Sequence, residues 1–364
     1  MSDKYRIDSH KLMFHPDRVS KWLDKYNLWG SAKEIYPIYA EISPIGICNH
    51  RCSFCGLDFM GYQNVKIDTA VLKQRLSEMA SLGLKSVMFA GEGEPSLHKD
   101  MPEIMDFCTE LGIDTALTTN IVPFNAKNSE VFVKNAKWIK VSINAGNRDA
   151  YSKIHNTKPE DFDKAVENMK YCIEIKKSKG YSCTIGAQML LLNDNFDTAV
   201  DLASISKYIG LDYLVIKPYS QHLSSNTIRY KNINYSKYLH LEAELEKYNS
   251  ADFKVIFRAN TINKTLNDDK KYQKCFSTPF FWAYIASNGD VYGCSCFLGD
   301  ERFCYGNINE ETFKNIWEGE RRKQNYEELQ GDFDINNCRL NCRMDEINRY
   351  LWELAHPTSH VNFI

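Results

Sequence analysis

Three cysteines lie within eight residues of one another, in the string Cys48-Asn-His-Arg-Cys52-Ser-Phe-Cys55. Three thiolates on one tight loop can ligate three irons of a [4Fe–4S] cluster, which ordinarily takes four cysteines. The fourth iron would be open to a non-protein ligand, and a substrate or cosubstrate could bind there and receive an electron. The alternative is a zinc site with His50 as the fourth ligand, although zinc cysteines usually come in C-x2-C pairs.

A second group of cysteines lies near the end of the chain. Its first part reads C-x13-G-x4-C around Gly289, and the string Asn288-Gly289 predicts the turn of a β-hairpin. A later pair is spaced C-x3-C. Four thiolates from a hairpin and a later loop would make a closed site, either a structural zinc or a fully ligated [4Fe–4S] cluster. The four candidate ligands are Cys275, Cys294, Cys338 and Cys342.

The other five cysteines have no such spacing. Cys108, Cys172 and Cys183 fall in helix or strand patterns, and we expect them to be small buried core residues. Cys296 and Cys304 lie between the candidate ligands. We interpret them first as inert buried thiols, and otherwise as alternate ligands or a hydrogen-atom donor that faces the substrate.

Strand and helix patterns alternate after residue 35. Six strand–helix units in a row predict parallel strands with outer helices, either a barrel or an open doubly wound sheet. The predicted strands are Tyr39–Ser43, Ser86–Ala90, Asp114–Thr119, Trp138–Asn144, Cys183–Leu190 and Tyr213–Lys217. The predicted helices lie near 69–82, 99–111, 127–136, 159–179, 195–209 and 236–248.

Polar residues and glycines gather where these strands end, which is where parallel barrels place their active sites. The segment Ala90–Pro95 (Ala-Gly-Glu-Gly-Glu-Pro) follows the second strand, and its glycines would let backbone approach a ligand closely. The fourth strand ends with Ser142 and Asn144, whose side chains suit a ribose. Gln188 lies within the apolar fifth strand and needs a polar partner there.

The end of the sixth strand has the highest density of polar residues. Lys217, Tyr219, Gln221 and His222 follow one another closely there. We interpret Lys217, Gln221 and His222 as the residues that contact the substrate, with a solvated loop as the alternative. Arg258 follows the apolar run Phe253–Phe257 and is a weaker candidate.

The composition limits the class of protein. The chain has 364 residues, enough for two domains, and 45 Lys and Arg balance 47 Asp and Glu. This balance gives no reason to expect nucleic-acid binding. We find no signal peptide and no run of about 18 apolar residues, so we expect a cytoplasmic protein with no membrane association. Twelve cysteines in such a chain indicate metal binding.

The C-x3-C-x2-C string and the Gly-Glu-Pro segment together resemble the signature of the radical S-adenosylmethionine (SAM) superfamily. The resemblance implies an α/β fold with a partial (β/α)6 barrel, and SAM bound to the open iron through its amino and carboxylate groups. It assigns recognition of the SAM amine to Gly93 and Glu94, while Glu92 leaves open whether Gly91 or Gly93 makes the close contact. Ser142 and Asn144 resemble the ribose-binding Ser-x-Asp segment with Asn in place of Asp, and Gln188 would contact SAM or substrate.

The C-terminal cysteines resemble those of SPASM domains, or of their shorter twitch form, which hold auxiliary clusters. Only the final C-x3-C of the longer SPASM pattern is evident, so we predict one auxiliary [4Fe–4S] cluster. The predicted domains are a helical extension (1–35), the barrel (36–265) and the auxiliary-cluster domain with a C-terminal helix (266–364).

The resemblance also implies the chemistry: a 5′-deoxyadenosyl radical removes a hydrogen atom from the substrate, with flavodoxin or ferredoxin as electron donor. We expect a small polar metabolite as substrate, such as a carbohydrate, aminocyclitol or nucleotide-linked sugar. Twitch domains resemble those of the aminocyclitol dehydrogenase of butirosin synthesis and of the molybdenum-cofactor cyclase. The alternative is a peptide or protein maturase, and a non-enzymatic iron–sulfur or zinc-ribbon module comes third.

Overall fold

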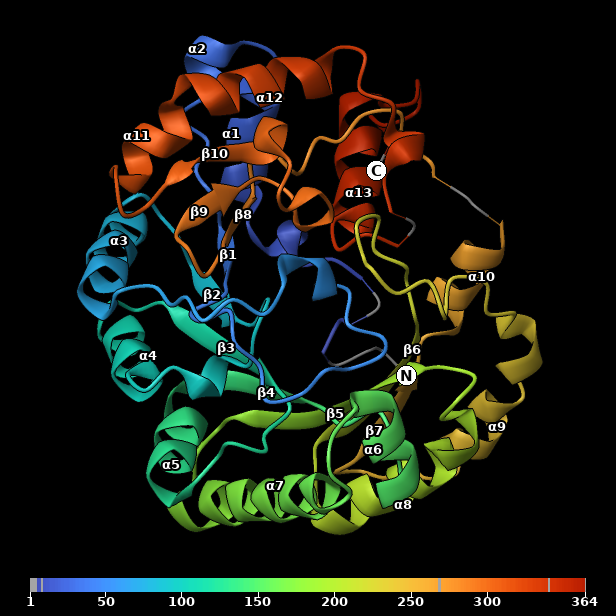
Figure 1. Ribbon diagram of the computed structural model, residues 1–364. Coiled ribbons are helices and arrows are strands. Elements are labelled where there is room, and N and C mark those ends of the chain that lie inside the picture. The colour runs from blue at the N-terminus through green and yellow to red at the C-terminus, as the bar shows by residue number, and fades with distance from the viewer. Residues whose placement is uncertain (1–4, 8, 268–269, 340, 364) are drawn as a thin grey trace.

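A computed structural model describes residues 5–7, 9–267, 270–339 and 341–363, and Figure 1 shows one sheet curled around a central axis. Neighbouring strands follow the order β10-β9-β8-β1-β2-β3-β4-β5-β6-β7. The strands are β1 (Tyr39–Ile42), β2 (Ser86–Phe89), β3 (Asp114–Thr119), β4 (Ala136–Ser142), β5 (Thr184–Leu191), β6 (Tyr213–Pro218), β7 (Lys254–Phe257), β8 (Trp282–Ile285), β9 (Asp290–Tyr292) and β10 (Cys304–Asn307).

The parallel strands β1 to β7 follow one another around the axis without a reversal of order. A doubly wound sheet would reverse its order near β1, so this succession excludes that alternative and confirms the predicted partial barrel. All six predicted strands are present, with ends that differ by at most two residues. β8 adds a further parallel strand beside β1, and β9 and β10 pair antiparallel beyond it.

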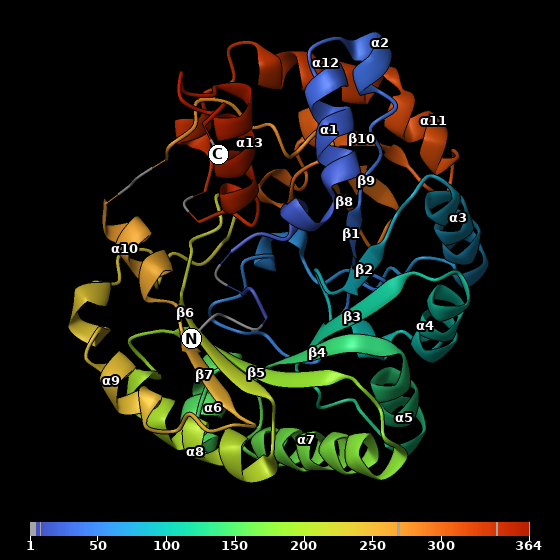
Figure 2. The same cartoon turned by 180° about the vertical axis from the view of Figure 1, so that it is seen from behind.

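Helices cover the outside of the barrel and form a layer at the C-terminal end of the chain (Figures 1 and 2). The six predicted helical regions are all helical. The helices are α1 (Pro16–Lys25), α2 (Trp29–Ala32), α3 (Thr69–Ser81), α4 (Met101–Glu110), α5 (Ala126–Asn135), α6 (Arg148–His155), α7 (Glu160–Lys179), α8 (Ala199–Ile209), α9 (Leu241–Glu246), α10 (Ala259–Asn267), α11 (Phe313–Glu318), α12 (Glu320–Gln330) and α13 (Asp345–Ala355).

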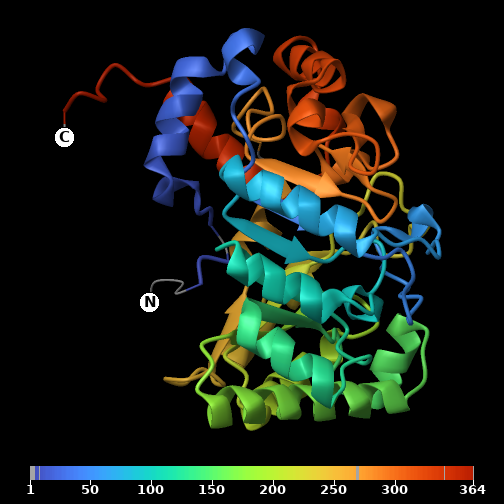
Figure 3. The same ribbon diagram turned by 90° about the vertical axis from the view of Figure 1, so that its left-hand side faces the viewer.

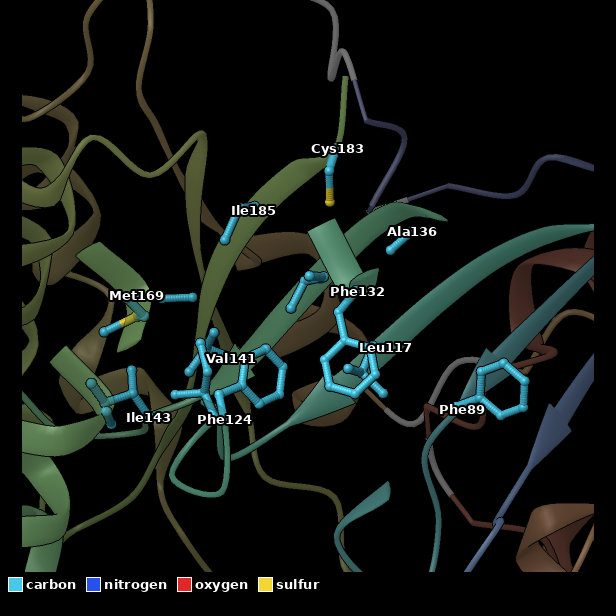
Figure 4. Close-up of a cluster of buried hydrophobic side chains, with 14 of the residues drawn as sticks. Phe89, Leu117, Phe124, Phe132, Ala136, Val141, Ile143, Met169, Cys183 and Ile185 are labelled. Atoms are coloured by element: carbon cyan, nitrogen blue, oxygen red, sulfur yellow. The ribbon is translucent and has the colours of Figure 1, made fainter. Parts of the chain in front are cut away.

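The main core lies between the strands and the outer helices. Figure 4 shows part of it, with Phe132 of α5 beside Leu117 of β3 and Val141 of β4. Cys108, Cys172 and Cys183 are each at most 1% exposed within this core, which confirms the prediction that they are buried packing residues. Since alternate strand residues fill this outer core, the residues between them face the barrel axis.

The N-terminal helices pack against the C-terminal part of the chain. Trp22 of α1 lies in a separate buried cluster with Phe276 and Leu351. In Figure 3 these blue helices and the light-blue loop near residue 60 lie on opposite sides of the strands. The buried Arg322 guanidinium ties the two ends together by donating to the carbonyl oxygens of Ile35 and Pro279.

The predicted hairpin is formed by β8 and β9. Gly289 takes a left-handed conformation (φ 93°), and its N–H donates to the Ala286 carbonyl at 2.9 Å. Within the described ranges, we find no helix of the length and apolar character that a membrane crossing requires.

Candidate active site

The three-cysteine loop follows β1, at the edge where the parallel strands end. Burial, then the nearby Glu94 and Cys55, raise the pKa of the Cys48 thiol to about 12. Burial, then Cys55 and Cys48, raise the pKa of Cys52. The three sulfurs are therefore close enough to repel one another as thiolates, and a bound cation would remove that repulsion.

Helix α6 contacts this loop, and the sequence did not predict that contact. His155 Nδ1 lies 3.1 Å from Cys52 Sγ, and its Nε2 lies 3.0 Å from the Ile143 carbonyl oxygen. A carbonyl can only accept, so Nε2 carries the proton and Nδ1 faces the cysteine as an acceptor. The Tyr151 ring stacks on the imidazole at 4.3 Å between centroids. The position of the middle cysteine thus depends on a buried histidine a hundred residues away.

The glycines after β2 fit a crowded corner between this loop and the C-terminal hairpin. A Cβ on Gly93 would lie 2.2 Å from the Ile47 carbonyl oxygen. A Cβ on Gly91, which has φ 116°, would lie 2.4 Å from Ser43 Cβ and 2.7 Å from the Tyr284 hydroxyl. Both positions therefore require glycine, and Gly93 is the one in contact with the cysteine loop.

Glu94 is buried, and its carboxylate is held by the residues around it. Oε1 accepts from the Thr119 hydroxyl at 2.6 Å and the Ser96 hydroxyl at 2.7 Å, and Oε2 accepts from the Asn120 N–H at 2.7 Å. Burial raises the pKa of Glu94, and these bonds oppose that rise. The predicted SAM-binding role of Glu94 stays a prediction. The structure adds that this side chain fixes the loop after β2 to the end of β3.

Glu92, the residue that interrupts the glycine pair, reaches the C-terminal hairpin. Its Oε2 accepts from the Ser287 hydroxyl at 2.6 Å and its Oε1 from the Ser287 N–H at 3.2 Å. Glu92 is 6% exposed, and this burial raises the pKa of its carboxyl group. The loop after β2 is thereby joined directly to the turn between β8 and β9.

The predicted ribose residues differ in how their side chains are used. Asn144 takes a left-handed conformation (φ 55°); its Oδ1 accepts from Leu190 N–H at 2.8 Å and its Nδ2 donates to the Ser142 carbonyl at 3.1 Å. Ser142 and Gln188 are register partners on β4 and β5. Within the described part of the chain, the Ser142 hydroxyl and the Gln188 amide have no hydrogen-bond partner. These two side chains are the better placed to bind an added ligand.

Of the three predicted substrate residues, one lies on β6 and two lie in the loop that follows it. Lys217 faces the barrel axis from β6, since its neighbour Ile216 packs in the outer core. Gln221 lies in the following loop, where its Nε2 donates to the Thr227 carbonyl at 2.8 Å. Lys217 thus reaches the barrel interior, and the buried Oε1 of Gln221 has no hydrogen-bond partner in the described part of the chain.

His222 connects the loop after β6 to the C-terminal domain. Its Nε2 donates to the Ser295 carbonyl at 2.9 Å, and its Nδ1 accepts from the Ser224 N–H at 3.1 Å. The ring stacks on Phe59, which follows the cysteine loop, at 4.9 Å between centroids. Both ring nitrogens are engaged in this way, so the neutral His222 positions the loop.

A group of basic side chains surrounds Lys217. Burial is the largest cause of its lowered pKa, and the four other cations of the group each lower it further. Burial, then Arg343, lowers the pKa of Lys140 to about 8. The sequence reasoning singled out only two of this group, because the strand register and the C-terminal loop bring the rest together. The five are Lys140, Lys217, Arg258, Arg339 and Arg343.

The C-terminal cysteines face one cavity. Cys275, Cys294, Cys338 and Cys342 all line it, in agreement with their predicted grouping, and Cys296 lines it with them. Cys296 is thus a buried thiol at the wall of the candidate site, while Cys304 is absent from the lining residues described for this cavity. Asn348 of α13 donates from Nδ2 to Cys275 Sγ at 3.4 Å.

Both sets of thiols fit iron–sulfur clusters by their chemistry, because these clusters take soft thiolate ligands. Among the described residues, no three His, Cys, Asp or Glu side chains converge as ligands of a single metal ion. The N-terminal set offers three thiols on one loop, and the C-terminal set offers four or five thiols around a cavity.

Two family profiles match the chain. The radical SAM superfamily matches residues 42–204, which include the cysteine loop and the segment after β2. The SPASM iron–sulfur cluster-binding domain matches residues 275–343, which include all four C-terminal cysteines. The chain belongs to the radical SAM superfamily. Its cofactors are accordingly the [4Fe–4S] cluster and SAM of that superfamily, with auxiliary cluster binding in the SPASM domain.

Curated relatives of this radical SAM protein differ in their named activities. A PqqA peptide cyclase from Methylobacterium sp. (strain 4-46) is 28% identical over 33% of this chain and 35% of that relative. The Fe-coproporphyrin III synthase of Methanosarcina barkeri is 25% identical over 51% of this chain and 43% of its own length. The AdoMet-dependent heme synthase of the same organism is 22% identical over 81% of this chain and 87% of its own length. The chain thus spans less than half the length of the first two.

Solved structures confirm the fold of the radical SAM barrel with its SPASM domain. Streptococcus suis SuiB bound to the precursor peptide SuiA matches with a TM-score of 0.65 at 20% identity, over 88% of this chain and 71% of that one. The anSMEcpe structure with bound AdoMet and the Cp18Cys peptide matches with a TM-score of 0.57 at 17% identity, over 86% and 88%.

Proposed function

We propose that this radical SAM protein modifies a peptide by removing a hydrogen atom from one of its residues. The sequence reasoning preferred a small polar metabolite, and the comparisons favour its alternative. Three curated relatives are named PqqA peptide cyclases, and two structural relatives hold peptides. The site observation that supports the proposal is the direct contact of the loops after β2 and β6 with the SPASM domain, through Glu92 and His222, beside a basic barrel interior.

The chain's own residues divide the work. Cys48, Cys52 and Cys55 would hold the N-terminal cluster, with Gly93 backbone beside it. Once bound, the cluster and SAM supply a carbon-centred radical, after an electron from flavodoxin or ferredoxin. Ser142 and Gln188 would donate or accept hydrogen bonds at the nucleoside part of SAM, because their polar groups face the interior and lack protein partners.

The loop after β6 helps to close the site. Asp58 accepts from Ser225 Oγ at 3.0 Å, Asn226 N–H at 2.9 Å and Thr227 N–H at 3.0 Å. These charge-assisted bonds fasten the loop over the segment that follows Cys55. A fastened loop limits the access of water to a radical, which protects it from side reactions.

The auxiliary cluster would be held by Cys275, Cys294, Cys338 and Cys342. With all four positions taken by thiolates it would have no iron free for substrate, so we assign it an electron-transfer role if the reaction is an oxidation. Glu92 and His222 contact the SPASM hairpin and the residue after Cys294, and so connect the two cofactor regions within one rigid frame.

A second candidate is an anionic small molecule. Two relatives are named Fe-coproporphyrin III synthase and S-adenosylmethionine-dependent nucleotide dehydratase, and the interior of this barrel is basic. An anaerobic assay tests both candidates by measuring 5′-deoxyadenosine after addition of pooled peptides or pooled nucleotides and porphyrins. Deuterium transfer from a labelled peptide into 5′-deoxyadenosine would support the proposal. Transfer from the small molecules alone would overturn it in favour of the second candidate.

A further inference from the structure

Cationic side chains from several strands gather in the described part of the barrel interior. Lys140 faces the axis from β4, where its neighbours Ile139 and Val141 pack in the outer core. Lys217 faces the axis from β6 in the same way, and Arg258 directly follows β7. Each of these cations comes from a different strand, so the cluster is a property of the fold and not of one local sequence.

Two arginines reach this interior from the candidate auxiliary-cluster loop. Arg343 directly follows Cys342; its Nη1 forms an ion pair with Glu41 Oε2 and donates a hydrogen bond to the Tyr39 hydroxyl, both at 2.7 Å. Arg339 directly follows Cys338 and donates from Nε to Ser220 Oγ at 2.7 Å. The loop that would hold the second cluster therefore projects its guanidinium groups toward the substrate side of the barrel.

The Glu41 carboxylate raises the pKa of Lys140, and Arg343 already pairs with this carboxylate. Within the described residues, Lys217 has no hydrogen bond or ion pair, although it lies deep in the protein and is partly solvent-accessible. Buried cations without partners destabilise a fold, because they lose water and repel one another. A purely structural cluster would pair them with carboxylates.

We propose that Lys140, Lys217 and the two C-terminal arginines bind an oxyanion of the substrate between the barrel and the auxiliary-cluster loop. This inference rests on the proposed function, in which the oxyanion is the carboxylate of an acidic peptide residue. A phosphate has the same recognition chemistry and would belong to the second candidate. Planar guanidinium groups bind either oxyanion through two parallel N–H bonds, and the lysines add compact charge.

The consequence is a substrate with one fixed end. An anionic group held beside Arg339 and Arg343 would lie next to the residues proposed as cluster ligands. The rest of the substrate would extend along the axis toward Ser142 and Gln188. Lys140 and Ser142 are two residues apart on the same face of β4, so the anionic group would lie about 7 Å along the strand from the proposed SAM-binding side chains and would set substrate specificity without being the reacting centre.

The test is anion binding by the anaerobically reconstituted, SAM-bound protein, measured by calorimetry with glutarate and with inorganic phosphate. We expect saturable binding that weakens at least about tenfold in Lys217→Met, because a charge-assisted contact is lost. Lys164→Met, an exposed lysine of α7, is the matched control and should bind as the wild type does. Tighter binding of glutarate indicates a carboxylate, and tighter binding of phosphate indicates a phosphorylated substrate.

Absence of binding by both anions, or equal affinity in Lys217→Met and wild type, would overturn the inference. If Lys217→Met does not fold, Lys140→Met replaces it, with the same two expectations. The outcome is independent of the peptide assay. Failure of every peptide with intact, Lys217-dependent anion binding would refute only the proposed function, and peptide modification without anion binding would refute only this inference.

Discussion

The two cysteine sites of this protein are built in opposite ways. The N-terminal thiols lie within eight residues on one loop, and the barrel supports that loop through His155 and Gly93. The C-terminal thiols are spread between residues 275 and 342 and meet only because a hairpin and a later loop surround one cavity. A local site can be disrupted without loss of the fold, whereas a site made from distant segments also staples those segments together.

The largest effect is expected at the middle cysteine of the N-terminal loop. Cys52→Ala leaves two thiols there, so the cluster should be lost and SAM cleavage should fall to background. Iron content should drop from about eight to about four per chain, because the C-terminal site keeps its cluster. Iron analysis and 5′-deoxyadenosine assays measure both results. SAM cleavage at the wild-type rate would show that the cysteine loop does not hold the catalytic cluster.

The second largest effect is expected from Cys338→Ala combined with Cys342→Ala. Iron should again fall to about four per chain, but here the melting temperature should fall as well, since the cavity loses the metal that links its segments. Thermal unfolding followed by circular dichroism measures the second effect. An unchanged melting temperature would show that the C-terminal site does not stabilise the fold. Full yield of oxidised product would refute its electron-transfer role.

A Cys296 variant tests which cysteines of the C-terminal cavity are cluster ligands. Cys296 lines the same cavity as the four predicted ligands, and we expect it not to ligate. Cys296→Ser should therefore retain about eight irons per chain. Mössbauer spectra of this variant distinguish a retained cluster from one that has lost a ligand, and a loss of about four irons would place Cys296 in the ligand set.

A smaller effect is expected at Glu92, which joins the loop after β2 to the hairpin of the SPASM domain. Glu92→Gln replaces a carboxylate that accepts two bonds from Ser287 with an amide that can keep only part of them. We expect a loss of about 1 to 2 kcal/mol in the free energy of unfolding. Asp17→Asn on the surface of α1 serves as control. Equal stability of the two variants would contradict the proposed link.

An effect of similar size is expected in the opposite direction at Lys140. The pKa of Lys140 is lowered to about 8 from its usual 10.5, so below pH 8 the folded protein holds a disfavoured charge. Between about pH 8 and 10.5 the unfolded chain binds more protons at this site, and stability rises with pH. Lys140→Met should stabilise the protein at pH 7 by on the order of 1 to 3 kcal/mol, and by less at pH 9.5. A destabilised variant at pH 7 would refute this.

Much of the architecture could be predicted from the sequence, because alternating apolar runs and helical patterns mark each strand–helix unit. The grouping of Cys275, Cys294, Cys338 and Cys342 was also predictable from their spacing. The register of β4 and β6 was not predictable. This register decides which alternate residues of each strand face the axis. Lys140 became a candidate only when Ile139 and Val141 were seen in the outer core.

Other site features lacked any local signal. His155 lies on an eight-residue helix whose sequence is mostly polar, and its contact with Cys52 arises from tertiary packing. In the sequence, Arg339 and Arg343 are simply two charged residues beside two cysteines. The fold brings them to Ser220 and Glu41. Gln221 and His222 were chosen because polar residues follow an apolar strand, and this pattern does not reveal that their side chains contact protein partners.

The central claim is that one chain holds two clusters, one open to SAM and one fully ligated. The contents of iron, acid-labile sulfide and zinc, all measured after anaerobic reconstitution, test this claim most directly. The account predicts about eight irons and eight sulfides per chain. About four irons with one tightly bound zinc would contradict it, because the C-terminal cysteines would then form a structural zinc site.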